Sequence, residues 1–403
     1  MEVIYIITSF FMQEIQKIIN TELWYLMRNE WKNDKKFFSY FFFSIMRIRT
    51  TIMNKLWLLK YKNPDKMSEK IKHFFEKDSF KDFNLKVEKR CFSMLWEINK
   101  NDYIVFDEVD ISKQYSKKLE DLAKVRDGST WNIVSWYMYH WVSINAIPVI
   151  LEYEDLTNNF KWEYFWKLVV KVENYAKWNW IYVLDAWYDI ASYMDFLNDK
   201  VNRWIIRAKK NRIYFDLKTN KYLKLKDFKD WVHKVKIKSV KEAVYLHIKS
   251  NQKYIEPMRI LSNSRKIDVE EYKNRREIET IFKTMKQEFQ LEKLQVSSLI
   301  VFKNFVATIQ LAMALTRTIY KQNDSFVENQ RFVLSPKFKS RFRNYTKYQW
   351  ITMNSNSIVK FISYCLQKLY KLPKNNIKNL SNKNSWVLPQ LSLFSSVDFM
   401  KSG

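Results

Sequence analysis

Glycine is the residue most clearly missing from this sequence. Only Gly128 and Gly403 occur among 403 residues, whereas a usual frequency of about 7% would give roughly 28. Glycine supplies the positive φ angles of many tight turns. The turns of this protein must therefore be built from other residues, or some positions written as other residues are glycine in the native protein.

Cysteine and histidine are also scarce. Cys91 and Cys365 form no C-x-x-C pair, and no zinc-binding spacing occurs among the four histidines, His73, His140, His233 and His247. These absences argue against a disulfide scaffold and a structural zinc site. They favour a reducing, intracellular setting, and we expect a cytoplasmic protein.

Long hydrophobic runs are lacking as well. The apolar residues 1–12 are too few to span a bilayer and lack the basic start of a signal peptide. The stretch from Leu299 to Leu315 is interrupted by Lys303, Asn304 and Gln310. We therefore predict a buried helix there and no membrane partner.

Acidic residues are in deficit. The chain has 70 Lys plus Arg against 43 Asp plus Glu, which gives a net charge of +27. Such an excess points to a polyanionic partner, most simply nucleic acid. The alternative is that an AT-rich genome inflates the number of lysine codons. Hydrophobic residues at 47% favour one or two globular domains over disorder.

The pattern of apolar residues changes along the chain. Residues 1–95 have helical spacing, so we predict a helical N-terminal module for DNA binding or dimerisation. Residues 96–325 alternate short apolar runs with a helical segment, which predicts an α/β domain. The expected strands are 103–106, 133–139, 146–152, 181–184 and 204–206, with a helix at 160–175.

Three further segments differ in composition. Residues from about 208 to 265 alternate polar and apolar side chains. Between Val201 and Lys253 there are 16 Lys or Arg but only 4 Asp or Glu. This pattern predicts an all-β insertion with a basic surface, although an ordinary antiparallel subdomain without DNA contact is the alternative. Residues 326–372 read as a C-terminal helical segment and residues 373–403 as a polar tail.

One helix face combines unusual side chains. Tyr272, Arg275, Glu279 and Lys286 lie at offsets 0, 3, 7 and 14, which at about 100° per residue brings them within roughly 60° of one another. A phenol, a guanidinium, a carboxylate and an ammonium together suit the handling of phosphates beside a metal ion. The alternative is an amphipathic helix with merely exposed charges.

This spacing resembles the Tyr-x2-Arg-x3-Glu-x6-Lys signature of bacterial insertion-sequence transposases of the DDE type. The runs YIVFDEVD (103–110), IYVLDAWYD (181–189) and WIIRAKKNR (204–212) stand in the order expected of that group. The resemblance covers about residues 100–320. It implies a ribonuclease H-like catalytic domain, in which a mixed sheet is flanked by helices and carries a strand-rich insertion.

The resemblance implies a transposase, an enzyme that cleaves DNA at element ends and joins them to target DNA. Asp107, Asp185 and Glu279 would be the catalytic residues and the ligands of two Mg²⁺ ions, with Mn²⁺ as a substitute. Asp107 and Asp185 are expected where apolar strands end. Val109 replaces the threonine of the family pattern, which leaves Asp110 as a second candidate, and Asp189 is expected to cap a helix.

The expected partner is double-stranded DNA, bound by a homodimer in the nucleoid. By resemblance, the DNA-binding residues are Tyr272, Arg275, Lys286, Arg207, Lys209 and Arg212. For the basic residues a solvated surface role is the alternative. Trp231 in the insertion is a candidate for stacking on a displaced base; the alternatives are a tryptophan in the core or a position that is glycine in the native protein.

Two other functions fit the same sequence. A degenerate copy would bind DNA without catalysis, as Val109 and the missing glycines suggest. A basic structural or membrane-surface protein would have no reason to bring Asp107, Asp185 and Glu279 together. The arrangement of these three acids separates that last hypothesis from the first two.

Tryptophan is abundant in this sequence, which has 16 tryptophans but only two glycines. In related transposases glycines occur near Trp131, Trp136 and Trp141, and the position of Trp187 is normally glycine. We hypothesise that many of these tryptophans are UGA codons that the source organism reads as glycine. The alternative is a protein that is rich in tryptophan.

Mass spectrometry of peptides from the native protein tests this hypothesis. We expect glycine at positions 131, 136, 141 and 187, because a residue beside a catalytic strand often needs close backbone approach. Peptides from a tryptophan-free region of the same protein provide the mass calibration. Intact tryptophan at positions 131 and 187 would end the hypothesis.

Overall fold

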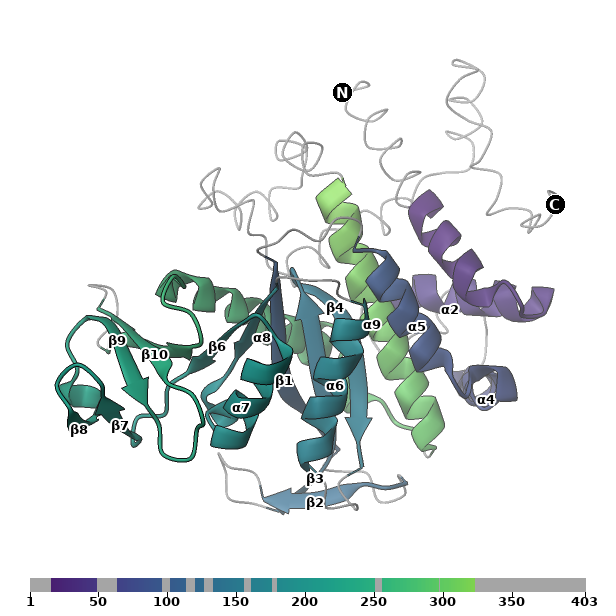
Figure 1. The fold of residues 1–403 in the computed structure, drawn as a ribbon. Coiled ribbons are helices and arrows are strands. Elements are labelled where there is room, and N and C mark those ends of the chain that lie inside the picture. The colour runs from purple at the N-terminus through teal and green to yellow at the C-terminus, as the bar shows by residue number, and fades with distance from the viewer. Residues whose placement is uncertain are drawn as a thin grey trace, which may run out of the picture. The chain divides into compact units, whose positions relative to one another are not determined.

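The computed structural model describes residues 16–48, 64–95, 102–113, 120–126, 133–155, 161–175, 180–250, 256–296 and 298–322. The predicted segments 326–372 and 373–403 lie outside them. Two compact units form among the described residues: those up to 90, residue 120 and those from 283 onward make the first, and those within 91–116 and 121–282 make the second. Figure 1 shows the elements of both.

The first unit is helical where it is described. Residues 16–27 form a helix, and the chain returns to this unit after residue 282. The other elements are α2 (Lys32–Ile48), α4 (Pro64–Phe75), η2 (Asp78–Phe80), α5 (Phe83–Ser93), η6 (Thr284–Glu288), η7 (Leu291–Lys293) and α9 (Leu299–Gln322).

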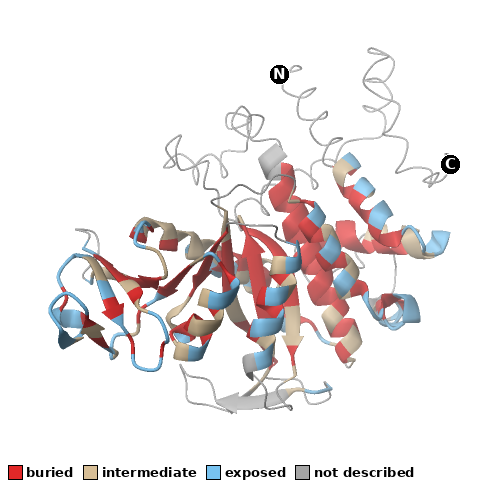
Figure 2. Cartoon of the chain, viewed as in Figure 1, coloured by how far each residue is buried: buried red, intermediate tan, exposed pale blue. Residues whose placement is uncertain are grey.

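Phenylalanine rings and the helix α9 form the core of this unit. Phe305 of α9 packs edge-on against Phe41 and also against Phe75, with ring centroids 5.2 and 5.5 Å apart. Within α9, residues 299–319 are long and apolar enough to cross a membrane, but 89% of the most apolar window is buried in the protein. The prediction of a buried helix over 299–315 is therefore confirmed, and Figure 2 shows α9 as buried.

A mixed β-sheet forms the second unit. Its strands follow the order β4-β3-β1-β5-β6-β11-β10-β9-β7-β8, and β2 pairs with the start of β3. β5 runs parallel to β1 and to β6, whereas β3 runs antiparallel to β1. The strands of the central part are β1 (Tyr103–Ser112), β2 (Ala123–Arg126), β3 (Ile133–Ile144), β4 (Ile147–Glu154), β5 (Ile181–Leu184) and β6 (Arg203–Arg207).

Helices pack on both faces of the sheet. Phe106 of β1 contacts Phe165 of α6 (Lys161–Tyr175), which lies beside α7 (Ala191–Lys200). On the opposite face, Trp141 of β3 contacts Phe282 of α8 (Arg276–Lys283). The predicted fold class, an α/β mixed sheet flanked by helices, is confirmed (Figure 1), and the strand order is consistent with a ribonuclease H-like fold.

The predicted β-rich insertion consists of strands, but these extend the central sheet. β11 pairs antiparallel with β6 and connects β10, β9, β7 and β8 to it. Figure 2 shows that burial decreases from β10 toward β8. The bounds are β7 (Ile213–Asp216), β8 (Lys221–Lys224), η4 (Leu225–Asp227), β9 (Trp231–Lys236), β10 (Val244–Lys249) and β11 (Met258–Ser262).

Tight turns form here without glycine. Asn145 and Ala146 join β3 to β4 with φ angles of 51° and 62°, the two positive values of a type I′ hairpin turn. Asparagine tolerates this region because its side chain bonds locally, whereas alanine is strained in it. The turn therefore keeps the geometry that glycine usually supplies.

Asn304 joins α9 to the ends of two shorter helices. Its buried amide donates to the carbonyl oxygens of Phe75, the last residue of α4, and Phe80, at 3.0 and 3.2 Å. Such carbonyls at helix ends have no partner within the helix. The side chain therefore satisfies backbone groups that would otherwise be buried without hydrogen bonds.

We expect Asn304→Leu to lower the free energy of unfolding by about 2 kcal/mol, because two buried carbonyls lose their donor. Thermal and urea unfolding measure this change. Thr308→Val is the matched control, since the Thr308 hydroxyl donates to the Asn304 carbonyl of its own helix, at 2.7 Å. Equal losses in both variants would contradict the role assigned to the Asn304 amide.

Candidate active site

Asp107 lies in the middle of β1. The expectation that it ends its strand is wrong, because β1 continues to Ser112 alongside the long strand β3. Its side chain is 15% exposed, and its Oδ1 accepts the Glu108 backbone N–H at 3.0 Å. Burial raises the pKa of Asp107 to about 6, with Arg275 opposing the rise and the Asp185 charge adding to it.

Asp185 directly follows β5, as predicted. β1 and β5 pair in parallel with Val105 opposite Val183, so continuing this register by two residues brings Asp185 beside Asp107. Asp185 caps the short helix η3 (Ala186–Tyr188), and its Oδ1 accepts the Ala186 N–H at 2.6 Å. The two aspartates therefore emerge from adjacent strands with fixed backbone positions.

The segment from Val269 to Lys283 supplies the third acid. Asp268 and Glu271 form a capping box that starts the 3₁₀ helix η5 (Val269–Arg275), and α8 follows directly. Glu279 lies in the first turn of α8, with a side chain that is 56% exposed. The acids from β1, from the end of β5 and from α8 thus belong to one compact unit.

Arg275 joins the three acids. Its Nη2 lies 2.9 Å from Asp107 Oδ2 and 3.1 Å from Asp185 Oδ2, and its Nη1 lies 2.5 Å from Glu279 Oε1. These carboxylates raise the pKa of Arg275 against the opposing effect of burial. The Tyr272 hydroxyl donates to Asp185 Oδ1 at 3.4 Å, and burial raises its pKa. The clustering argues against the hypothesis of a structural protein.

The predicted single helix face is wrong in its geometry. Tyr272 and Arg275 lie in the 3₁₀ helix, Glu279 in the α-helix, and Lys286 in the π-helical turn η6. The angles assumed for 3.6 residues per turn do not hold across these three kinds of helix. Lys286 belongs to the other compact unit, where its Nζ lies 3.6 Å from Glu292 Oε1.

Glu108 and Asp189 lie close in sequence to the two aspartates but have other contacts. Glu108 points to the face opposite Asp107, where it lies 3.9 Å from His140. Asp189 caps a helix as expected, but it does so at the C-terminal end of η3, whereas Ile190 is the N-cap of α7. Asp189 is fully buried, and its Oδ2 accepts the Lys209 backbone N–H at 2.8 Å.

The basic residues at the end of β6 and after it divide into two kinds. Arg207 is exposed, and its charge acts to lower the pKa of the nearby Tyr272 hydroxyl. Lys209 Nζ donates to the Asp189 carbonyl at 3.0 Å, and Arg212 Nη2 lies 2.7 Å from Asp189 Oδ1. Lys209 and Arg212 therefore hold a buried carboxylate and the backbone around it.

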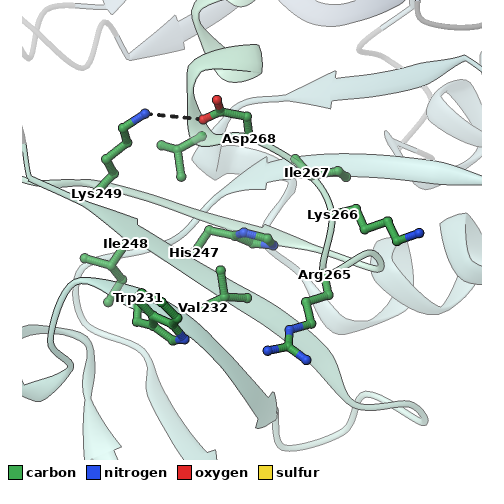
Figure 3. A pocket seen from close by; sticks show the side chains of 10 residues that line it. Trp231, Val232, His247, Ile248, Lys249, Arg265, Lys266, Ile267 and Asp268 are labelled. Atoms are coloured by element: carbon green, nitrogen blue, oxygen red, sulfur yellow. Dashed lines mark hydrogen bonds and ion pairs between the residues drawn. The ribbon is translucent and has the colours of Figure 1, made fainter.

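An open pocket of about 340 Å³ lies in the insertion (Figure 3). Trp231, 70% exposed, lies at one end of it, and Arg265 and Lys266 come from the loop after β11. Lys249 lies 3.5 Å from Asp268 at its rim. The alternative of a core position for Trp231 is wrong, because the residue lies at the surface.

Three of the four tryptophans at expected glycine positions are described. None of Trp136, Trp141 and Trp187 has a positive φ angle, so their backbone does not require glycine. Trp141 is fully buried opposite Asp107, and its indole N–H has no hydrogen-bond partner among the described residues. A buried donor without a partner is unfavourable, which keeps the hypothesis of native glycine in place. Trp131 lies outside the described residues.

Among the described residues, no group of three or more His, Cys, Asp or Glu side chains is placed to hold a metal ion by itself. The three acids are joined through Arg275 instead. Their chemistry nevertheless fits Mg²⁺, which takes carboxylate oxygens, and all three already contact one shared cation. The donor set therefore fits a divalent ion in the position that the guanidinium now takes.

An acidic site on a mixed α/β sheet is thus the defining feature of this protein. Residues 163–315 match the family described as "Transposase DDE domain". The matched span contains Asp185, Tyr272, Arg275 and Glu279, and Asp107 precedes it. The match supports a DDE-type transposase.

The chain is similar to a solved transposase structure but matches no curated protein. A cryo-EM structure of a piggyBac transposase synaptic complex with hairpin DNA is similar with a TM-score of 0.45 and 9% sequence identity, over 88% of this chain and 76% of that chain. A comparison with curated proteins finds no match.

Arg212→Met tests the role of Arg212. We expect a loss of about 3 kcal/mol in the free energy of unfolding at pH 8, because a buried carboxylate loses its charged partner. Burial already raises the pKa of Asp189. The variant raises it further, so the loss should shrink as the pH falls and Asp189 takes up a proton.

The control is Arg207→Met, which removes an exposed arginine at the end of β6, before the turn that carries Arg212, and should change stability little. Unfolding curves at several pH values measure both variants. A variant at position 212 that is as stable as the parent, but binds DNA less tightly, would contradict the structural role.

Proposed function

We propose that this protein is a DNA transposase of the insertion-sequence group with the Tyr-Arg-Glu-Lys signature. It cleaves DNA at the element ends by phosphodiester hydrolysis and joins them to target DNA by transesterification. The observation that carries this proposal is the convergence of Asp107, Asp185 and Glu279 on one guanidinium. The family match over residues 163–315 supports it.

Asp107, Asp185 and Glu279 would hold two Mg²⁺ ions, or Mn²⁺ in their place. When bound, the ions supply activation of a water nucleophile and stabilisation of the leaving oxygen. The protein supplies fixed ligand positions. Asp107 is held within a paired strand and by the Glu108 N–H, and Asp185 by the Ala186 N–H and the Tyr272 hydroxyl.

Glu279 differs from the two aspartates in its exposure. It is on the first turn of α8, and it contacts Arg275 at the edge of the cluster. The carboxylate can therefore change its partner without opening the protein core. This exposure suits a ligand that must meet DNA and solvent.

DNA would lie across the acidic site and the basic insertion. The net charge of +27 favours phosphate binding, and exposed Arg207 lies near Tyr272. The pocket with Trp231, Arg265 and Lys266 presents a ring and two cations, which suits a nucleic-acid strand. Two copies of the protein would bring two element ends together in the cytoplasm.

Glu279→Gln tests the catalytic assignment. The substrate is a plasmid that carries the genomic DNA flanking the gene, incubated with Mg²⁺ or Mn²⁺. We expect the parent protein to cleave and transfer strands, and the variant to lose activity by on the order of 100-fold or more, because a ligand carboxylate becomes neutral.

Glu277→Gln is the matched control, since it makes the same change in the same helix, on a different side. It should retain activity. Equal activity of the Glu279 variant and the parent would remove Glu279 from the site. A parent protein that binds the flanking DNA but cleaves with neither metal would instead be a degenerate transposase.

A further inference from the structure

We propose that Arg275 is an internal counter-ion that takes the place of the divalent cation in the metal-free protein. It must leave the three carboxylates before a metal ion can bind them. The inference rests on the proposed function, because it assumes that these acids are metal ligands. It gives Arg275 a part in metal loading as well as the DNA contact that the resemblance implies.

The first support is that each carboxylate oxygen of Asp107 and Asp185 already has a hydrogen-bond partner. Arg275 binds Oδ2 of Asp107 and Oδ2 of Asp185 through one nitrogen. The two Oδ1 atoms accept the backbone N–H groups of Glu108 and Ala186. An arriving cation therefore finds Oδ2 of both aspartates already bound to the guanidinium, and it must compete with the guanidinium for them.

The second support is charge. Three carboxylates share a single guanidinium in a site where Asp107 and Arg275 are 15% and 12% exposed. Removing one partner from a buried charge cluster is strongly unfavourable, because the remaining charges lose their compensation. A divalent cation restores that compensation, because it brings a charge of +2 where the guanidinium brought +1.

The third support is that Arg275 is incompletely satisfied where it lies. Its Nε is buried without a hydrogen-bond partner among the described residues. Arg275 is the last residue of η5, where the chain changes from a 3₁₀ to an α-helix, and Glu279, its third partner, is mostly exposed. The guanidinium therefore has a route toward the surface, and its planar fork matches a phosphate group there.

The experiment measures Mn²⁺ binding and thermal stability of the full-length parent and Arg275→Gln. Free Mn²⁺ is followed by electron paramagnetic resonance, and unfolding is followed with EDTA and with Mn²⁺. We expect the variant to bind Mn²⁺ about tenfold more tightly, because no internal cation competes. Its melting temperature should fall in EDTA and recover with Mn²⁺ by more than that of the parent.

Three variants serve as controls. Arg212→Gln removes a guanidinium from another buried carboxylate, Asp189, so it should lose stability without gaining Mn²⁺ affinity. Asp107→Asn should lose Mn²⁺ binding altogether. Arg275→Lys keeps the charge but not the fork, and it should fall between the parent and Arg275→Gln; it carries the test alone if the glutamine variant does not fold.

The outcomes separate this inference from the proposed function. If the Arg275 variants bind Mn²⁺ no more tightly than the parent, while Asp107→Asn loses binding, the counter-ion role is overturned and the metal site stands. If neither the parent nor any Arg275 variant binds Mn²⁺, the metal assignment fails and the counter-ion role fails with it.

Discussion

The ion pairs between Arg275 and three carboxylates are the constraint on which the site depends. Asp107, Asp185 and Glu279 come from a strand, a strand end and a helix that are far apart in the sequence. Without a cation, their like charges would repel at short range. The rise in the pKa of Asp107 to about 6 shows the combined effect of burial and neighbouring negative charge. The three carboxylates therefore need a cation between them to stay this close together.

The sheet makes the arrangement possible. Parallel pairing of β1 with β5 brings two aspartates together by register alone, and the contact of Trp141 with Phe282 fixes α8 against the same face. Side chains on that face alternate with those that contact α6. Glu108, one residue from Asp107, is therefore directed to His140 and takes no part in the acid cluster.

Sequence patterns predicted those parts of the site that depend on residues close to one another along the chain. Apolar runs identified the positions of β1, β3, β4, β5 and β6, because buried strands need them. The end of β1 was not predictable, since its continuation past Asp107 depends on pairing with β3, which is distant along the chain. The break of the Tyr272–Lys286 segment into 3₁₀, α and π turns was missed for a related reason. Its apolar spacing does not reveal which helical hydrogen bonds the packing selects.

Basic residues show most clearly why spacing alone cannot assign a role. Arg207, Lys209 and Arg212 stand within six residues of one another and were all expected to contact DNA. Arg207 is exposed, whereas Arg212 is largely covered and paired with a carboxylate that no solvent reaches. A buried carboxylate needs a charged partner more than a surface phosphate does, because water cannot screen it. The same argument applies to Arg275. Its guanidinium binds the carboxylates within the protein, and it becomes available to DNA only after another cation has replaced it there.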